Sequence, residues 1–284
     1  MKQSVILVVA LAALLVGSVA LVREPGEGGS TPSAASTFDR IVTEGKMTVC
    51  YVPWPPLIIK EPNTGALSGF IIDIWNEVAA DAHLETAYVE STWGGFTADL
   101  KTGKCDAGVA GFYPTIGRSA SVAFTEPFLY AGNGAAGRAG DGRFTTLGDL
   151  NRKGIRVAVV QGEYGHIYAE KYLPDATLVI LEKSADLTMP LVSVSSGQAD
   201  VGLSTTNVIE AYVEQHPEVQ ELFGGAPYST TPVAWAVRTG DQELLNFLNN
   251  ALGYLAATGA IEQSVQRYHP AGIFQLAQEY EALS

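Results

Sequence analysis

The sequence predicts an α/β protein built from two lobes with a ligand cleft between them. Strand-like and helix-like segments alternate along most of the chain, which is typical of parallel sheets covered by helices. This alternating series starts twice, once near residue 47 and again near residue 155. At 284 residues, the chain is long enough for two lobes of roughly 100 residues each.

An apolar segment marks the N-terminus. From Val5 to Val22 every residue is apolar or small, so the segment lies between a long signal-peptide core and a short transmembrane helix. We therefore expect residues 1–23 to be a signal peptide or an N-terminal membrane anchor, and in both cases the rest of the chain is exported. Residues 24–36 are rich in Gly, Pro and Ser without periodicity, which predicts a flexible linker.

The first half of the folded chain is expected to hold three strand–helix units. Apolar residues recur at helical spacing after Ser68, which is a candidate N-cap for that helix. Gly103 is expected to end a second, shorter helix. The expected elements are strands at 47–52, 87–90 and 107–111 and helices at 70–82 and 96–102.

The second half repeats this pattern. It begins with a β-branched apolar run and a Gln161-Gly162 turn, and it ends with leucines at helical spacing from Leu245 to Leu255. The expected elements are strands at 155–160, 177–181, 200–203 and 233–237 and helices at 165–172, 187–196, 206–215 and 241–257, with a final helix ending at Tyr268.

The chain is expected to cross between the lobes twice, near 130–138 and near 231–234. These crossings would form a two-stranded hinge beside the ligand cleft. Lobe 1 would then comprise residues 37–131 and 234–284, and lobe 2 would comprise residues 132–233.

A GxGxxG pattern at Gly132, Gly134 and Gly137 falls in the first crossing. The residues after it are polar and Gly-rich, so the apolar helix that a dinucleotide site needs is missing. We expect these glycines to give the hinge conformational freedom instead.

Composition and motifs argue against several functions. The net charge of −13 and only 17 Lys and Arg residues disfavour binding to nucleic acid. The four histidines are far apart, so no metal is expected, and no cofactor is predicted. There is no GxSxG motif and no sign that two carboxylates converge, which indicates a protein that is not an enzyme.

The two cysteines, Cys50 and Cys105, fall in or beside predicted strands of the same half. Such a pair fits an oxidising compartment, where it is often bridged. Two buried free thiols are an equally good reading of the sequence.

Five segments occur in order along the first half: GKMTVCYVPWPPL, GALSGFIIDIWNEVA, WGGFTADLKTGKCDAGVAG, PTIGR and FTEPFLY. The second half adds LGDLNRKGIRVAVVQGEYG, SGQADVGLSTTNV and LNNALGYLAATGAIEQSVQRY. Together they resemble family 3 extracytoplasmic solute-binding proteins of amino-acid ABC transporters.

The resemblance covers nearly the whole exported chain and implies a periplasmic binding protein type 2 fold. It implies a protein that closes on a small carboxylate ligand, an amino acid or a close relative, and presents it to a transporter permease. We expect an extracytoplasmic monomer that contacts the membrane through its N-terminal segment if that segment is not cleaved.

The resemblance also assigns the carboxylate site. Thr115 and Arg118 follow the predicted strand that ends at Gly111, where the family has the Thr and Arg that hold the ligand's α-carboxylate. Gly111 itself is also expected to be a ligand-binding residue. A guanidinium presents a planar fork of donors that matches a carboxylate. Trp54 and Trp93 match aromatic residues that cover the ligand in relatives, and packing in the core is the alternative role for both.

The second lobe is expected to complete the site with the turn at Gln161, Glu163 and Tyr164, because a helix N-terminus favours a negative group. The family often has an ammonium-binding aspartate where this chain has Thr205, and Tyr113 replaces a smaller residue near Arg118. Either Glu163 supplies the missing counter-charge, or the ligand has no α-amino group.

Two other functions compete with the transport role. A few proteins of this fold dehydrate cyclic acids, and Glu163 is the one candidate acid or base for such a reaction. A ligand-sensing module of a receptor is the other alternative, which we expect less because no second apolar span follows toward Ser284.

Overall fold

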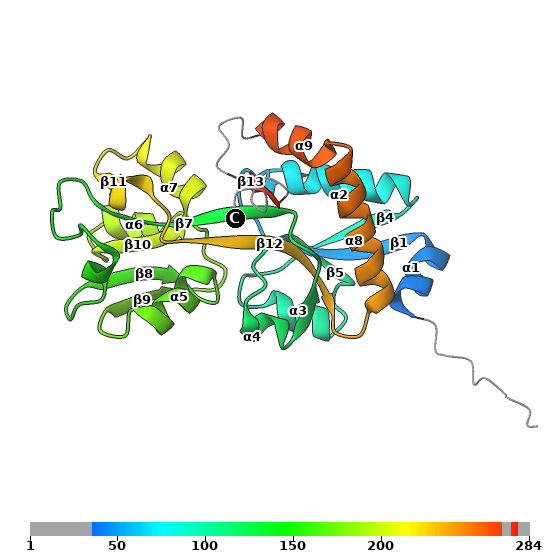
Figure 1. The fold of residues 1–284 in the computed structure, drawn as a ribbon, viewed down its shortest axis with the longest axis horizontal. Coiled ribbons are helices and arrows are strands. Elements are labelled where there is room, and N and C mark those ends of the chain that lie inside the picture. Colours follow the sequence, from blue (N-terminus) through cyan, green and yellow to red (C-terminus); the bar gives the residue numbers. More distant parts are fainter. Residues whose placement is uncertain (1–35, 269–273, 278–284) are drawn as a thin grey trace, which may run out of the picture. The chain divides into compact units, whose positions relative to one another are not determined.

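Two long strands, β7 (Leu129–Arg138) and β12 (Ser229–Arg238), connect two α/β lobes in the computed structural model (Figure 1). The structure describes residues 36–268 and 274–277. The predicted signal peptide or anchor at 1–23, and all of the predicted linker except Ser36, lie outside the described residues.

The strands form a sheet in the order β4-β1-β5-β12-β7-β10-β8-β9. The first half of β12 pairs antiparallel with the first half of β7, and its second half pairs with β5 and β6. The second half of β7 pairs with β10 and β11. Each of the two strands therefore belongs to both lobes, which confirms the predicted two-stranded connection.

The first lobe contains a parallel group in which β1 lies between β4 and β5. Its strands are β1 (Lys46–Tyr51), β2 (Ile59–Lys60), β3 (Leu67–Ser68), β4 (Glu85–Glu90), β5 (Ala107–Phe112), β6 (Val122–Phe124) and β13 (Gln275–Leu276). Its helices are α1 (Thr37–Glu44), α2 (Phe70–Asp81), α3 (Phe96–Lys101), α4 (Ile116–Ser119), α8 (Gln242–Ala257) and α9 (Ala260–Tyr268).

The second lobe has β8 between β9 and β10, again in parallel. Its strands are β8 (Arg156–Val160), β9 (Thr177–Leu181), β10 (Val201–Thr205) and β11 (Val219–Glu221). Its helices are α5 (Tyr164–Tyr172), α6 (Met189–Ser195) and α7 (Thr206–Val213), with short 3₁₀ turns at Leu147–Leu150 and Phe223–Gly225.

The predicted lobe boundaries at 131/132 and 233/234 fall inside β7 and β12. Both strands run through these positions without a break, so the residue bounds of the lobes remain a prediction. Within the described residues, no helix has the length and apolar character needed to cross a membrane.

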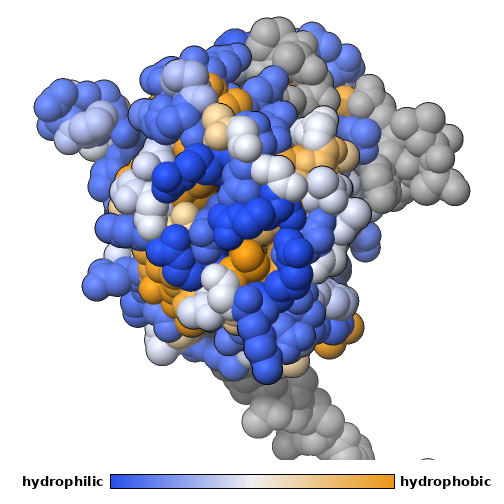
Figure 2. All heavy atoms as spheres, turned by 90° about the vertical axis from the view of Figure 1, so that its left-hand side faces the viewer, coloured by the Kyte–Doolittle hydropathy of each residue, from blue (hydrophilic) through white to orange (hydrophobic). Residues whose placement is uncertain are grey.

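Figure 2 looks at the end of the molecule that carries the second lobe. Apolar residues appear there as small patches among hydrophilic ones. Ile180 of β9 and Met189 and Val192 of α6 are among the exposed large hydrophobic residues of this lobe. Small exposed apolar patches of this kind are ordinary on protein surfaces.

The N-terminus of α2 corrects one prediction. Ser68 does not cap this helix, because it lies in β3 and the N-cap is Gly69, which makes no side-chain hydrogen bond. Gly69 has φ = 112°, and a Cβ atom there would overlap backbone atoms of Pro56 and Leu57. Close approach of the backbone, rather than capping chemistry, determines the residue at this position.

The GxGxxG glycines lie in the extended strand β7, and none of them has a positive φ. Their contribution to the freedom of the hinge stays a prediction, and the structure shows a packing role for two of them. A Cβ at Gly132 would lie 2.9 Å from Thr206 Oγ1, and one at Gly134 would lie 2.9 Å from Ile209 Cδ1. These glycines let α7 pack closely on the connecting strand.

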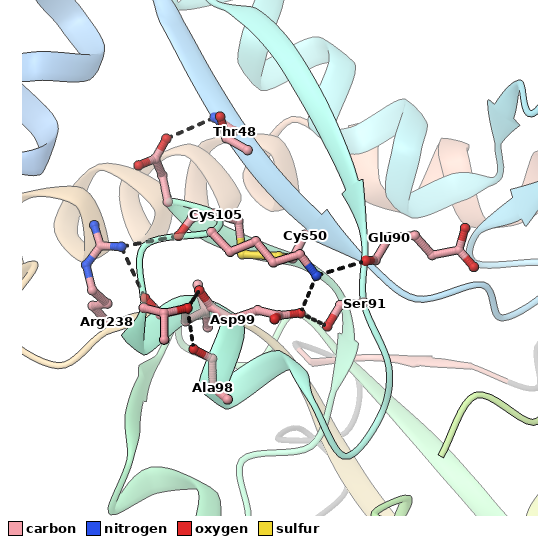
Figure 3. Close-up of a disulfide and its surroundings, with 12 residues drawn as sticks. Thr48, Cys50, Glu90, Ser91, Ala98, Asp99, Cys105 and Arg238 are labelled. Carbon is pink, nitrogen blue, oxygen red and sulfur yellow. Dashed lines mark hydrogen bonds and ion pairs between the residues drawn. A yellow bond between two sulfur atoms is a disulfide. The ribbon is translucent and has the colours of Figure 1, made fainter. Parts of the chain in front are cut away.

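A disulfide joins Cys50 of β1 to Cys105, two residues before β5 (Figure 3). The sequence was compatible with either a disulfide or two free thiols, and the structure contains the disulfide. Arg238 supports the same loop by donating to the carbonyls of Leu100 and Cys105, each at 3.2 Å. The bridge links segments 55 residues apart in sequence and ties two neighbouring strands of the first lobe.

Replacing both cysteines with serine is expected to lower the free energy of unfolding by about 2 to 4 kcal/mol, because the unfolded chain regains the freedom of a long loop. Denaturant unfolding of the double variant and of the oxidised parent would measure the difference. Equal stability of the two proteins would mean that the thiols are free in solution.

Candidate ligand-binding site

A small cavity of about 10 Å³ lies between the lobes and is lined by residues from both. Eight of the ten predicted site residues line it, and Thr115 and Gln161 do not. The lining residues are Trp54, Trp93, Gly111, Tyr113, Arg118, Glu163, Tyr164, Leu187 and Thr205. Pockets for small ligands are usually several hundred Å³, so in this closed arrangement the lobes would have to separate before an amino acid could enter.

Arg118 is held by the short helix α4. Thr115 is the N-cap of this helix, and its hydroxyl accepts a hydrogen bond from the Arg118 N–H at 3.4 Å. Thr115 therefore shapes the turn that carries the arginine instead of lining the cavity, although the sequence predicted both residues to contact a carboxylate.

The Arg118 guanidinium contacts acceptors from both lobes. It donates to the carbonyl of Tyr113 at 3.1 Å and that of Trp93 at 3.4 Å in the first lobe. Its shortest bond, 2.7 Å, goes to the carbonyl of Gly162 in the second lobe. Its Cζ atom also lies 5.2 Å from the ring centroid of Phe96. Burial lowers the pKa of Arg118 to about 10, so the side chain is still a cation at neutral pH.

The lobes meet backbone to backbone beside this arginine. Gly162 has φ = 79°, and a Cβ there would lie 2.5 Å from the Cα of Gly94. Asn207 of α7 makes a second connection by donating to the carbonyl of Pro55 at 3.0 Å. Only glycine fits such a contact at positive φ, so the sequence at Gly162 is dictated by how closely the lobes approach.

Glu163 is the N-cap of α5, and its carboxylate accepts a hydrogen bond from the Gly165 N–H at 2.6 Å. The residue is only 4% exposed. Burial raises the pKa of Glu163 above its ordinary value, while the backbone N–H groups of the helix and the charge of Arg118 act in the opposite direction. A buried carboxyl group therefore faces the same cavity as the buried guanidinium.

Aromatic rings form much of the remaining wall. Trp54 packs edge-on against Trp93 at 5.8 Å, Tyr113 at 6.0 Å and Phe274 at 6.1 Å between ring centroids. Tyr113 in turn lies 5.6 Å from Tyr164 of the second lobe. The two roles considered for Trp54, core packing and a place in the site, are combined, since it is 1% exposed and lines the cavity.

Three buried polar atoms in the wall have no hydrogen-bond partner among residues 36–268 and 274–277. They are the Trp54 indole nitrogen, the Tyr113 hydroxyl oxygen and the hydroxyl oxygen of Thr205, which stands at the N-cap position of α7 without a capping hydrogen bond. Buried polar groups are normally satisfied, so an unpaired one in a cavity wall is available to a bound molecule.

Other contacts are absent from the sequence prediction. Leu187 lines the cavity from the loop before α6, and neither it nor the Asn207–Pro55 hydrogen bond has a local sequence signal. Gln161 is exposed outside the cavity. In the part of the chain that the structure describes, no group of three or more His, Cys, Asp or Glu side chains could hold a metal ion.

Two α/β lobes that share two strands and enclose a cavity between them define the fold class of type 2 periplasmic binding proteins. The model of the bacterial extracellular solute-binding proteins, family 3, matches residues 47–271. The chain belongs to this family.

Individual relatives agree with this assignment. An L-arginine-binding protein of Pseudomonas aeruginosa is 28% identical over 224 residues, covering 76% of this chain and 84% of that protein. The glutamine-binding protein of a Bacillus subtilis ABC transporter is 24% identical over 213 residues, covering 74% and 76% of the two chains. The solved structure of an ancestral amino acid-binding protein, a precursor of cyclohexadienyl dehydratase, has a TM-score of 0.72 at 28% identity and covers 82% of this chain and 99% of that chain.

Glu163→Gln is expected to stabilise the protein at neutral pH. A carboxyl group whose pKa is higher in the folded state favours folding at low pH, and this contribution is lost as the pH rises from the ordinary value of 4.5 through the folded pKa. The stability gain of the variant should therefore grow over that pH interval, as measured by denaturant unfolding at several pH values. Glu77→Gln, at an exposed position of α2, should give no such trend.

Proposed function

We propose that this protein captures an amino acid, or a close relative bearing a carboxylate, between its lobes and delivers it to the permease of an ABC transporter. The observation that carries the proposal is Arg118, a buried cation in the wall of the interlobe cavity whose donors reach acceptors of both lobes. The names of the arginine- and glutamine-binding relatives support the ligand class.

Capture would begin when the lobes separate and the Arg118–Gly162 hydrogen bond breaks. The guanidinium could then bind the ligand's carboxylate through two parallel N–H donors. On closure, the turn at Gly162 would approach the carboxylate and the rings of Trp54 and Trp93 would enclose the rest of the ligand. Because both lobes contact the ligand only when closed, binding favours the closed state.

We also propose that the protein works outside the cytoplasm. The apolar segment from Val5 to Val22 is typical of export, and the Cys50–Cys105 disulfide suits an oxidising compartment. The segment would either be cleaved or hold the protein to the membrane. In either form we expect a monomer that binds its ligand without chemical conversion.

A catalytic role is the second candidate, and Glu163 is the observation that favours it. A carboxyl group buried in a cavity with a raised pKa resembles the environment of a general acid. The solved relative described as a precursor of cyclohexadienyl dehydratase gives this candidate a reaction class. Incubating the purified protein with cyclohexadienyl acids and looking for new products would decide it, since a binding protein returns its ligand unchanged.

A thermal-shift screen of the purified protein against the proteinogenic amino acids and their des-amino acids tests the binding role. At a ligand concentration of about 100 times Kd, the folded state should gain about 2.7 kcal/mol, which raises Tm by several degrees. Absence of a shift with every carboxylate in the panel would refute the proposed function.

Arg118→Ala is expected to weaken binding of any ligand found in that screen by about 2 to 5 kcal/mol, because it removes the partner of a buried carboxylate. Titration calorimetry on the variant and its parent would measure this loss. Arg152→Ala, at an exposed position, should bind like the parent. Unchanged affinity in the Arg118 variant would show that the carboxylate binds elsewhere.

A further inference from the structure

Arg118 and Glu163 are the two formally charged residues in the described lining of the cavity, and they come from different lobes. The other lining residues are aromatic, aliphatic, glycine or threonine. A molecule enclosed there therefore meets one cation on the first lobe, one anion on the second and neutral walls between them.

Glu163 has no salt-bridge partner among the described residues. The Glu163 carboxylate accepts a hydrogen bond from the backbone N–H of Gly165. The Arg118 guanidinium donates to three carbonyl oxygens instead of to this carboxylate. A carboxylate buried without an ion pair is unfavourable. An ammonium group brought into the cavity would supply the missing partner.

The hydroxyl of Thr205 adds a second acceptor for that ammonium group. It is 1% exposed, lines the same cavity and lacks a hydrogen-bond partner in the described part of the chain. A hydroxyl oxygen has two lone pairs, so it can accept an N–H donor from the ligand. Glu163 and Thr205 both belong to the second lobe, where each stands at the start of a helix.

We propose, on the basis of the proposed function, that the ligand is a zwitterion with an uncharged, largely apolar side chain, whose carboxylate pairs with Arg118 and whose ammonium pairs with Glu163. The ligand then neutralises one charge on each lobe, so that both lobes are needed to hold it. Binding one end by each lobe couples recognition to closure.

The same charge count disfavours cationic and anionic side chains. A second cation, as in arginine or lysine, would lie among Trp54, Trp93 and Tyr113, and the described lining of this cavity has no second carboxylate to pair with it. Attraction to an aromatic ring is weaker than the cost of removing such a charge from water. An acidic side chain would have no second cation in the described wall. The chain would thus differ in specificity from its arginine-binding relative.

Titration calorimetry with the full-length protein tests this proposal. The probes are leucine and phenylalanine as neutral zwitterions, arginine, lysine and glutamate as charged ones, and 4-methylpentanoate and 3-phenylpropanoate as the counterparts of leucine and phenylalanine without the amino group. We expect at least one neutral amino acid to bind 100-fold more tightly than every charged one and than its own des-amino counterpart.

Glu163→Gln then isolates the ammonium contact. The variant should lose at least 100-fold in affinity for the neutral amino acid and stay within about threefold of the parent for the des-amino acid, since only the ammonium is affected. Glu77→Gln serves as the control and should match the parent for both probes. Far-ultraviolet circular dichroism and thermal unfolding establish that the variants are folded.

The possible outcomes distinguish a failure of the specificity proposal from a failure of the proposed amino-acid-binding function. Tightest binding of arginine, lysine or glutamate would overturn the neutral-zwitterion proposal while leaving the amino-acid-binding function intact. Equal affinity for an amino acid and its des-amino counterpart, or full binding by Glu163→Gln, would overturn the role of Glu163. Binding of none of these probes would overturn this inference. The proposed function falls with it when the screen of all proteinogenic amino acids and their des-amino acids is also negative.

Discussion

The contact between the Arg118 guanidinium and the Gly162 carbonyl is the interaction on which the closed arrangement depends. It links the lobes at the cavity itself, and it satisfies a cation that the surrounding protein has removed from water. The turn that supplies the carbonyl needs glycine at 162, because a Cβ there would overlap the backbone of Gly94. The closest approach of the lobes and the identity of residue 162 thus follow from one hydrogen bond and the space around it.

Arg118 and Glu163 are each held by their own helix and do not form a salt bridge with each other. Arg118 is supported by a short capped helix in the first lobe, and Glu163 by the first turn of α5 in the second. Neither group needs the other for its hydrogen bonds, so each charge is available to a different end of the proposed ligand. A direct salt bridge would have neutralised both and left less for a ligand to gain.

Sequence predicted the fold and most of the cavity wall because these features have local signals. Alternating periodicity located the strands and helices that it predicted to within a few residues, but it did not identify α1, α4, β6 or β11. Motif resemblance located Trp54, Arg118 and Glu163. Leu187 and Asn207 could not be predicted, since their contacts exist only where the lobes meet. The prediction that Ser68 caps α2 was wrong because the N-cap is Gly69, where the backbone of Leu57 and Pro56 leaves no space for a side chain. A capping preference read from the sequence does not include this tertiary contact.

Helix α7 connects the cavity to the strands that join the lobes. Thr205 lines the cavity at its start, and within the next turn Thr206 and Ile209 pack onto glycines of β7 with no space to spare. One end of this helix therefore borders the cavity, while its side packs against a strand that belongs to both lobes. A ligand that displaced Thr205 would also press Thr206 and Ile209 against β7 and would in this way affect a strand that joins the lobes.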